Sequence, residues 1–174
     1  MGDRNGFTLI EVMVVCMIIA ILAGLAVPQT LKIMESSKLQ DAVGVVRIVA
    51  NAVRMSQLDY PNPTTAVNGQ LATLSSAGTC GSSGPATAND LMNCRYLAQQ
   101  DWTNAAYNYY ACSSGSGGGC CSSNSSAVAC ALRKSSNAYG DFAKWEVFVL
   151  TNGVCFTQCS STCSTYLPSN CPTI

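Results

Sequence analysis

The sequence predicts an α+β protein in which a long N-terminal helix packs on a small, disulfide-rich antiparallel sheet. Three observations predict this fold class: an apolar run near the start of the chain, a helical periodicity that follows it, and short strand-like runs with many cysteines after residue 60. The 174 residues correspond to one domain, or to one domain with an appendage. We expect a transmembrane helix over residues 7–28, an amphipathic half of the same helix over 29–59, and a globular domain over 60–174.

The composition excludes several classes of function. Nine Lys and Arg residues balance nine Asp and Glu residues, so the net charge is zero. The charge therefore gives no reason to expect a nucleic acid or an anionic membrane surface as partner. The chain contains no His, which excludes a Ser-His or Cys-His nucleophile and any metal site built on imidazole. No catalytic carboxylate pair and no phosphate-binding loop stands out. We therefore expect no enzymatic activity and no cofactor.

The apolar run extends from Phe7 to Val27, and its only polar members are Thr8 and Glu11. A helix of this length spans about 30 Å, the hydrocarbon thickness of a bilayer. The alternative is a cleaved secretory signal peptide, for which Gly24-Leu25-Ala26 offers small residues at the spacing of a cleavage site. The run is longer than the apolar core of an ordinary signal peptide and contains Glu11, so the sequence favours a retained transmembrane helix.

The helical pattern continues beyond the apolar run. Apolar residues recur in steps of three and four at Leu39, Val43, Val46, Ala50 and Val53. This stripe is widened by Val45, Val49, Ala52 and Met55. Pro28 is expected to weaken or kink the helix without necessarily ending it, whereas the prolines after Tyr60 end it. We expect most of the stripe to pack against the sheet of the same chain.

The part of the chain after residue 60 predicts an antiparallel sheet of three to four short strands. The strand-like runs are Tyr107–Cys112, Ala127–Leu132, Trp145–Thr151 and Val154–Gln158. Asn152-Gly153 between the last two is a strong hairpin signal. The stretch over 113–126, rich in Ser and Gly, predicts a loop and contains a weak glycosylation pattern at Asn124.

Aromatic residues gather around the first of these strands, at Trp102, Tyr107, Tyr109 and Tyr110. A ligand platform or a charge-transfer track is one interpretation of such a cluster. Aromatic residues in this setting more often fill a core or a sheet edge, and we expect that role here.

Ten of the eleven cysteines lie after residue 79 and predict an oxidising compartment with up to five disulfides. They are Cys80, Cys94, Cys112, Cys120, Cys121, Cys130, Cys155, Cys159, Cys163 and Cys171. Spacing does not give the connectivity, but we expect the local pair Cys80–Cys94, and different partners for the adjacent Cys120 and Cys121. The alternative is zinc bound by the last four of these cysteines, although their spacing is not that of an ordinary zinc finger. Cys16, inside the apolar run, is expected to behave as a small hydrophobe.

The start of the apolar run, with the sequence GFTLIE, resembles the processing site of type IV pilins and type II secretion pseudopilins. The resemblance implies that a prepilin peptidase cuts between Gly6 and Phe7, removing a leader of residues 1–6, and that Phe7 becomes N-methylated. It also implies that Phe7, Glu11 and Pro28 act in assembly, because Glu11 and Pro28 match the acidic residue and the mid-helix proline of the family. The long helix and small sheet agree with the architecture of that family.

A carboxylate inside a membrane span requires an explanation, because it costs about 2.5–3.5 kcal/mol at the centre of the span and less near an end. One explanation is that Glu11 snorkels to the cytoplasmic headgroups. The other requires removal of the leader, after which the new amine of Phe7 in a neighbouring subunit would pair with Glu11 in an apolar bundle. Such a pair would help to set the axial register of stacked helices.

The resemblance implies a structural subunit of a type IV pilus or a type II secretion pseudopilus, in a polymer of pilin subunits. The implied partners are a prepilin peptidase, a membrane-platform protein and a cytoplasmic assembly ATPase. The chain would cross the inner membrane once, with its C-terminal domain outside the cytoplasm, and then enter a periplasmic or cell-surface filament. The alternatives are a low-abundance tip or minor pilin acting as an adhesin or cargo-binding module, and an anchored protein that never polymerises.

Overall fold

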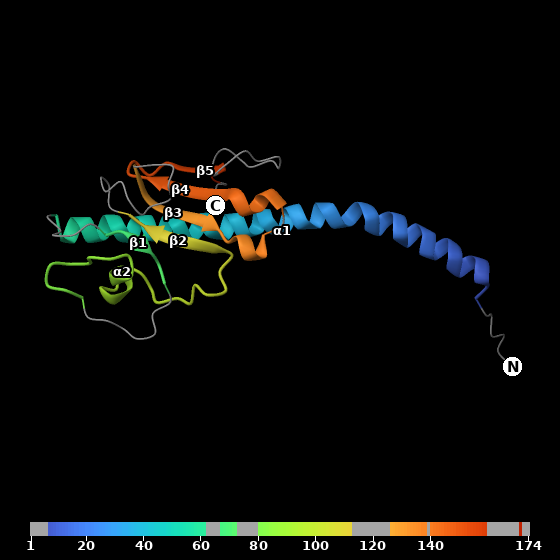
Figure 1. Cartoon of the computed structure of the whole chain (residues 1–174), viewed down its shortest axis with the longest axis horizontal. Helices are drawn as coiled ribbons and strands as arrows, with labels where there is room; N and C mark the ends of the chain where they lie inside the picture. Colours follow the sequence, from blue (N-terminus) through green and yellow to red (C-terminus); the bar gives the residue numbers. More distant parts are fainter. Residues whose placement is uncertain are drawn as a thin grey trace. The chain divides into compact units, whose positions relative to one another are not determined.

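A computed structural model describes the chain over residues 7–61, 67–72, 80–112, 126–138, 140–159 and 171. The chain divides into two compact units, Met1–Ser37 and Lys38–Ile174. A long helix, α1 (Leu9–Asp59), contributes residues to both units. The described part of the first unit is mainly the N-terminal part of α1, and the second unit holds the rest of α1 and a β-sheet (Figure 1).

α1 begins near the predicted start of the apolar run and ends before the prolines that follow Tyr60. Pro28 lies within α1, so the helix continues past the proline, as the sequence predicts. Near the proline, the hydroxyl of Thr30 donates to the carbonyl oxygens of Ala26 at 3.2 Å and Val27 at 2.8 Å. Proline has no N–H to donate to the preceding turn, and bonds from a threonine hydroxyl to helix carbonyls often accompany a bend in a helix.

The sheet of the second unit is antiparallel, and its strand order follows the chain, β1-β2-β3-β4-β5. The strands are β1 (Gly69–Gln70), β2 (Tyr107–Ala111), β3 (Ala127–Arg133), β4 (Trp145–Leu150) and β5 (Cys155–Cys159). In Figure 1, β2 to β5 lie side by side along the C-terminal part of α1. A bulge shifts the register of β3 and β4 between Ala127 and Ala129.

The predicted fold class is confirmed, and the four predicted strands are present with ends that differ by one residue. The expected number of three to four strands is too low, because the sheet of the described residues has five. The additional strand, β1, pairs Gly69 and Gln70 with the end of β2, and two residues show no alternation from which a strand is predicted. Other short elements that the sequence did not predict are α2 (Asp90–Asn93) and the 3-10 turns Ser135–Asn137 and Gly140–Lys144.

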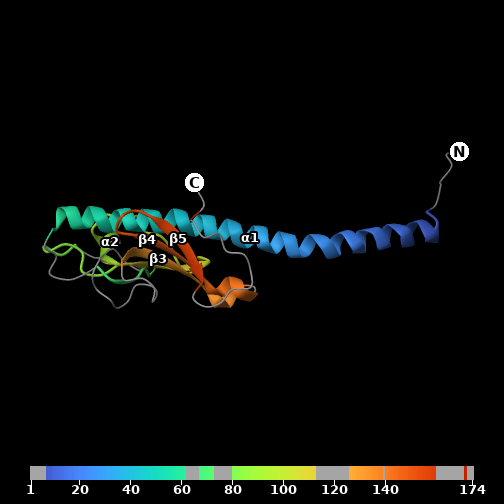
Figure 2. The same ribbon diagram turned by 90° about the horizontal axis from the view of Figure 1, so that it is seen from above.

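The core of the second unit lies between the C-terminal part of α1 and one face of the sheet, and Figure 2 shows the strands on one side of this part of the helix. The main residues of the predicted stripe are at most 1% exposed: Leu39, Val43, Val46, Ala50 and Val53. They share one cluster with Val147 and Val149 of β4, which confirms that the stripe packs on the sheet of its own chain. The inclusion of Met55 in the stripe is wrong, because its side chain is 58% exposed.

The opposite face of the sheet carries a second, smaller cluster around Phe148 of β4. Phe148 and its cross-strand partner Cys130 are fully buried. The ring of Phe148 stacks on that of Phe156 in β5, with centroids 5.2 Å apart. Side chains alternate between the faces of a strand, so β4 is buried on both sides.

β4 and β5 form the hairpin that Asn152-Gly153 predicts. The N–H of Leu150 donates to the carbonyl of Val154 at 2.9 Å, and the N–H of Gly153 donates to the carbonyl of Leu150 at 2.9 Å. Gly153 has a φ of 88°, the left-handed conformation that three-residue hairpin loops commonly assign to glycine. The turn residues therefore set the register of this strand pair locally.

Arg54 of α1 ties the helix to this hairpin, because its Nη2 donates to the carbonyl oxygens of Leu150 at 2.8 Å and Thr151 at 3.2 Å. We expect Arg54→Met to lower the free energy of unfolding by about 1–3 kcal/mol, since hydrogen bonds from charged groups contribute more than neutral ones. Urea unfolding of the full chain in detergent measures this loss. Arg47→Met, at a half-buried arginine on the same helix, is the control. Equal losses in both variants would contradict a specific contribution of the two hydrogen bonds.

Candidate functional site

A reciprocal pair of contacts between Thr8 and Glu11 closes the N-terminus of α1. The hydroxyl oxygen of Thr8 accepts the backbone N–H of Glu11 at 3.3 Å. One carboxylate oxygen of Glu11 accepts the backbone N–H of Thr8 at 3.3 Å and its hydroxyl at 3.2 Å. This arrangement is a capping box, which satisfies donors at the helix start and places a negative charge near the positive end of the helix dipole. Glu11 thus has a partner inside its own chain.

Thr8 is the residue of this site that the sequence analysis missed. The signal is visible in the sequence, since a threonine three residues before a glutamate at the start of an apolar run is a capping-box pattern. The contact between Glu11 and the amine of Phe7 in a neighbouring subunit stays a prediction. Phe7 is 83% exposed, whereas Gly6, the other residue of the expected cleavage site, lies outside the described residues.

Beyond its cap, the first unit presents an apolar surface. α1 is long and apolar enough to cross a membrane, by length and composition, and its most apolar stretch has no buried residue. The large apolar side chains between Phe7 and Val27 are 49–83% exposed. Cys16 lies among them, also exposed and outside any disulfide. A surface of this kind requires a cover of lipid or of other apolar helices.

Two disulfides are described in the second unit. Cys80 is bonded to Cys94 with their Cα atoms 4.7 Å apart, and Cys155 is bonded to Cys171 with Cα atoms 5.5 Å apart. Disulfide bonds also involve Cys112, Cys130 and Cys159. The other cysteines expected to form disulfides lie outside the described residues: Cys120, Cys121 and Cys163. The disulfide-rich character of the predicted fold is confirmed.

The zinc alternative for the last cysteines is wrong. Cys155 and Cys171 are bonded to each other, and Cys159 also belongs to a disulfide. Zinc binds thiolates, and a sulfur in a disulfide is not a thiolate. Over the part of the chain that the structure describes, no group of His, Cys, Asp and Glu residues is arranged to hold a metal ion.

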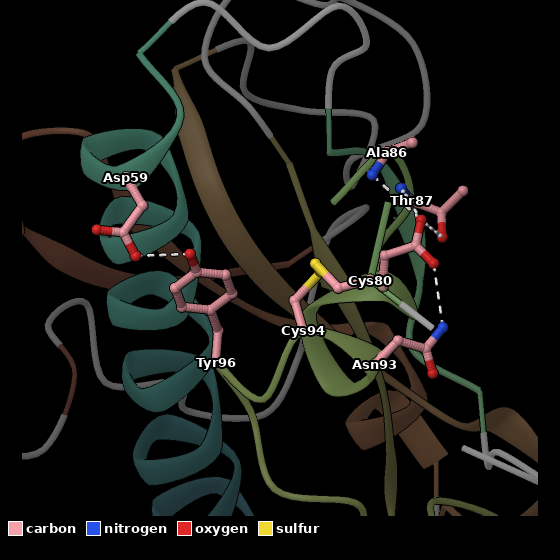
Figure 3. The surroundings of a disulfide bond; sticks show 8 residues. Asp59, Cys80, Ala86, Thr87, Asn93, Cys94 and Tyr96 are labelled. Carbon is pink, nitrogen blue, oxygen red and sulfur yellow. Dashed lines mark hydrogen bonds between the residues drawn. A yellow bond between two sulfur atoms is a disulfide. The ribbon is translucent and has the colours of Figure 1, made fainter. Parts of the chain in front are cut away.

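Residues 80–97, which we call the clamp loop, lie against the C-terminal end of α1 (Figure 3). The hydroxyl of Tyr96 donates to a carboxylate oxygen of Asp59 at 2.6 Å. This hydrogen bond is the main cause, and burial a smaller one, of a rise in the pKa of Tyr96 to about 12. Elsewhere in the loop, Gly84 lies so close to Tyr60 that a Cβ atom would stand 2.6 Å from the Cγ of the ring. The loop therefore contacts the last residue of α1, Asp59, and the residue that follows it, Tyr60.

Asp90 organises the interior of the clamp loop. One carboxylate oxygen accepts the backbone N–H groups of Ala86 at 3.1 Å and Thr87 at 2.9 Å, and also the Thr87 hydroxyl at 3.0 Å (Figure 3). The other oxygen accepts the side-chain amide of Asn93 at 3.1 Å. Burial opposes ionisation of the carboxyl, but these hydrogen bonds outweigh it and lower the pKa of Asp90. The ionised carboxylate thus stabilises the loop.

The lowered pKa of Asp90 predicts how stability depends on pH. A carboxyl whose pKa is lower in the folded state stabilises the fold above its unfolded pKa, here about 3.8, and this contribution disappears as the pH falls through the folded pKa. Asp90→Asn should therefore destabilise the chain at pH 6 and change its stability less at pH 2. Urea unfolding of the full chain in detergent from pH 2 to 6 measures the difference. The control is Asp41→Asn, at an exposed carboxylate of α1; an Asp90→Asn effect independent of pH would contradict the prediction.

Three of the four aromatic residues pack in the core, as expected, and the fourth, Tyr110, is half-buried against the second cluster. Trp102, Tyr107 and Tyr109 are buried, and the rings of Trp102 and Tyr109 lie 4.9 Å apart at 58°. The guanidinium of Arg133 lies 5.6 Å from the centroid of the Tyr107 ring. Burial, with a smaller effect of the Asp41 charge, raises the pKa of Tyr109 to about 12. The rings of Trp102, Tyr107 and Tyr109 therefore pack against other side chains of the same unit.

The part of the chain that holds this capped apolar helix matches a known family model. The family model described as "Prokaryotic N-terminal methylation motif" matches residues 1–27. This range includes the expected cleavage site, Thr8 and Glu11, and ends just before Pro28.

The chain is similar to the type II secretion system core protein G of several bacteria. It is 44% identical to the protein of Pseudomonas aeruginosa over 63 residues, which are 34% of this chain and 44% of that protein. It is 43% identical to the protein of Escherichia coli over 63 residues, which are 36% of this chain and 43% of that protein. The aligned part thus covers less than half the length of these relatives, and no solved structure gives a significant match. The chain is thus similar, over part of its length, to a methylation motif and to these secretion proteins.

Proposed function

We propose that the chain is a structural subunit of a filament assembled through its N-terminal helix, either a type II secretion pseudopilus or a type IV pilus. The observation that carries the proposal is the exposed apolar surface of α1 up to Val27, with its Thr8–Glu11 cap, inside a methylation motif. A surface of this kind must be covered by lipid or by other copies of the helix. The similarity to core protein G of type II secretion systems favours the pseudopilus.

The same helix would serve both storage in the membrane and packing in the filament. In lipid, helices gain little from hydrophobicity, so shape and charge must select their neighbours. Outside the bilayer, each helix would expose its apolar surface to water unless it packed against other copies. Burial at about 25 cal/mol per Å² then contributes roughly tens of kcal/mol per subunit against disassembly. A head-to-tail contact that does not close on itself gives a helical filament.

Cleavage between Gly6 and Phe7 would create the N-terminus through which the chain assembles into the filament. The new amine of Phe7 carries a positive charge, and Glu11 of a neighbouring copy is its counter-charge in the low-dielectric bundle. Before assembly, the hydrogen bonds from Thr8 reduce the cost of keeping the Glu11 carboxylate near the membrane. On assembly, the Glu11 carboxylate would gain a second partner, the amine of Phe7 in another subunit, in addition to Thr8 or in its place.

The remaining partners follow from this proposal. A prepilin peptidase removes the leader, and a cytoplasmic ATPase acting through a membrane-platform protein supplies the energy. The second unit lies outside the cytoplasm, where its disulfides form and persist. The chain is stored as a single-pass protein of the inner membrane and acts as a structural subunit rather than as an enzyme.

The experiment is co-expression of the full chain with a prepilin peptidase, followed by intact-mass measurement. We expect loss of Met1–Gly6 and a gain of one methyl group, and filaments labelled along their length when the rest of the assembly machinery is supplied. Gly6→Val is the control variant that keeps the helix and should block the cut. An unprocessed native chain, or a cut after Ala26, would contradict the proposal, and label only at filament ends would indicate a tip subunit instead.

A further inference from the structure

The second unit has a hollow of about 190 Å³ beside the edge strand β1. We call it the β1 hollow. Its lining includes Gln70, Ala72, Trp102, Thr103, Asn108 and Lys134. These residues come from β1 and β2 and from the segments next to β1, β2 and β3, so the tertiary fold alone brings them together. A volume of this size holds a ligand of several non-hydrogen atoms.

Lys134 provides a fixed positive charge in the β1 hollow. Its ammonium donates to the carbonyl oxygens of Trp102 and Thr103, each at 3.0 Å. An ammonium has three N–H donors, so one remains without a partner among the residues that the structure describes. The two carbonyls therefore hold the charge in place while a donor stays available to a ligand.

Two side-chain amides add further donors to the same hollow. The carbonyl oxygen of the Gln70 side chain accepts the hydroxyl of Tyr110 at 3.5 Å, which leaves its NH₂ group for a ligand. Asn108, half-buried on β2, contributes a second amide. None of the described residues that line the hollow is a carboxylate, so its charge is positive and its free hydrogen-bonding groups are mainly donors.

The lining also argues against a sugar as the occupant. Sugar rings usually stack on open aromatic faces, but Trp102 is only 7% exposed and Tyr107 is fully buried. Both rings already pack against the protein, Trp102 on Tyr109 and Tyr107 under Arg133. A donor-rich hollow with one fixed ammonium instead suits an anionic group that only accepts hydrogen bonds.

From this geometry we infer that the β1 hollow binds a carboxylate through Lys134, Gln70 and Asn108. A carboxylate presents two acceptor oxygens, and its hydrogen bonds to an ammonium are stronger than those between neutral groups. Its source is either a free small carboxylate or the terminal carboxylate of a peptide. This inference does not depend on filament assembly, because it concerns only the second unit.

The test uses the full chain in detergent and follows the side-chain amide signals of Asn108 and Gln70 by NMR. We expect acetate, succinate and trialanine to shift these signals with dissociation constants on the order of 1 mM, as for a few hydrogen bonds to a small ligand. Trialanine amide and glucose should leave them unchanged. Tighter binding of trialanine than of acetate would indicate a peptide end, and the reverse a free acid. No shift with any carboxylate at about 20 mM, well above the dissociation constants expected for such ligands, or equal shifts with trialanine amide or glucose, would overturn the inference.

Two variants locate the binding. Lys134→Met should weaken it at least about tenfold, since it removes the charge, whereas Lys144→Met removes a lysine outside the hollow and should leave it unchanged. Asn108→Asp is a second test that retains side-chain size, and its like charge should abolish carboxylate binding. Unchanged binding in Asn108→Asp would overturn the inference even if Lys134→Met failed to fold.

Discussion

Glu11→Gln is expected to leave membrane insertion intact and to reduce incorporation of the chain into filaments by roughly a hundredfold or more. The amide still accepts hydrogen bonds from Thr8, so the capping box that closes α1 keeps its geometry. The charge is lost, and under the proposed function the amine of Phe7 in the neighbouring subunit then has no counter-ion. Removing one partner of a buried ion pair costs about 3–5 kcal/mol, which corresponds to a factor of about 10² to several thousand.

The measurement is competitive co-assembly of tagged variant and native chains, with the ratio of the two read from purified filaments and from the membrane. Thr8→Val is the matched variant, because it removes the capping hydroxyl but keeps the carboxylate charge. We expect it to weaken the helix start by about 1 kcal/mol and to assemble far better than Glu11→Gln. Efficient assembly of Glu11→Gln together with failure of Thr8→Val would show that the cap matters and the charge pair does not.

The second large effect is expected at Gly84, where the clamp loop meets the end of α1. Gly84→Ala should lower the free energy of unfolding by about 2–4 kcal/mol. Two causes add: a φ of 85° disfavours any side chain, and the new Cβ would lie 2.6 Å from Cγ and 2.7 Å from Cδ2 of the Tyr60 ring. Thermal unfolding of the full chain in detergent, followed by near-UV circular dichroism, should show a midpoint lower by roughly 10 °C.

Two other glycines of the chain separate these causes. Gly140 has a φ of 55° but open space where an added Cβ would lie, so Gly140→Ala should cost only the backbone strain of about 1–2 kcal/mol. Gly81, in the same loop as Gly84, lacks a left-handed φ, and its added Cβ would lie 3.6 Å from the nearest atom, an ordinary contact. Gly81→Ala should therefore be neutral or slightly stabilising.

A double variant tests the contact with Tyr60 directly. If the ring causes part of the loss, Gly84→Ala combined with Tyr60→Ala should be less destabilising than the sum of the single variants, by about 1–3 kcal/mol. Strict additivity would show that the backbone conformation of Gly84 alone is responsible. A loss in Gly84→Ala no larger than in Gly140→Ala would lead to the same conclusion.

Features that depend on neighbours in the sequence could be predicted from the sequence. The apolar run and its periodic continuation predict α1, because a helix forms its backbone hydrogen bonds within one segment. Asn152-Gly153 predicts the hairpin because the turn conformation sets the register of the strands on either side. The Thr8–Glu11 cap belongs to the same kind, since its members are only three positions apart in the sequence.

Other features were decided by the tertiary structure alone. Three contacts join segments that are far apart in the chain. They are the pairing of β1 with β2, the hydrogen bond from Tyr96 to Asp59, and the hydrogen bonds from Arg54 to the β4–β5 turn. Met55 fits the helical period but remains exposed, because the sheet covers only part of the helix surface. Periodicity and turn chemistry act over a few residues, whereas a distant contact forms only when the packed core brings its two segments together.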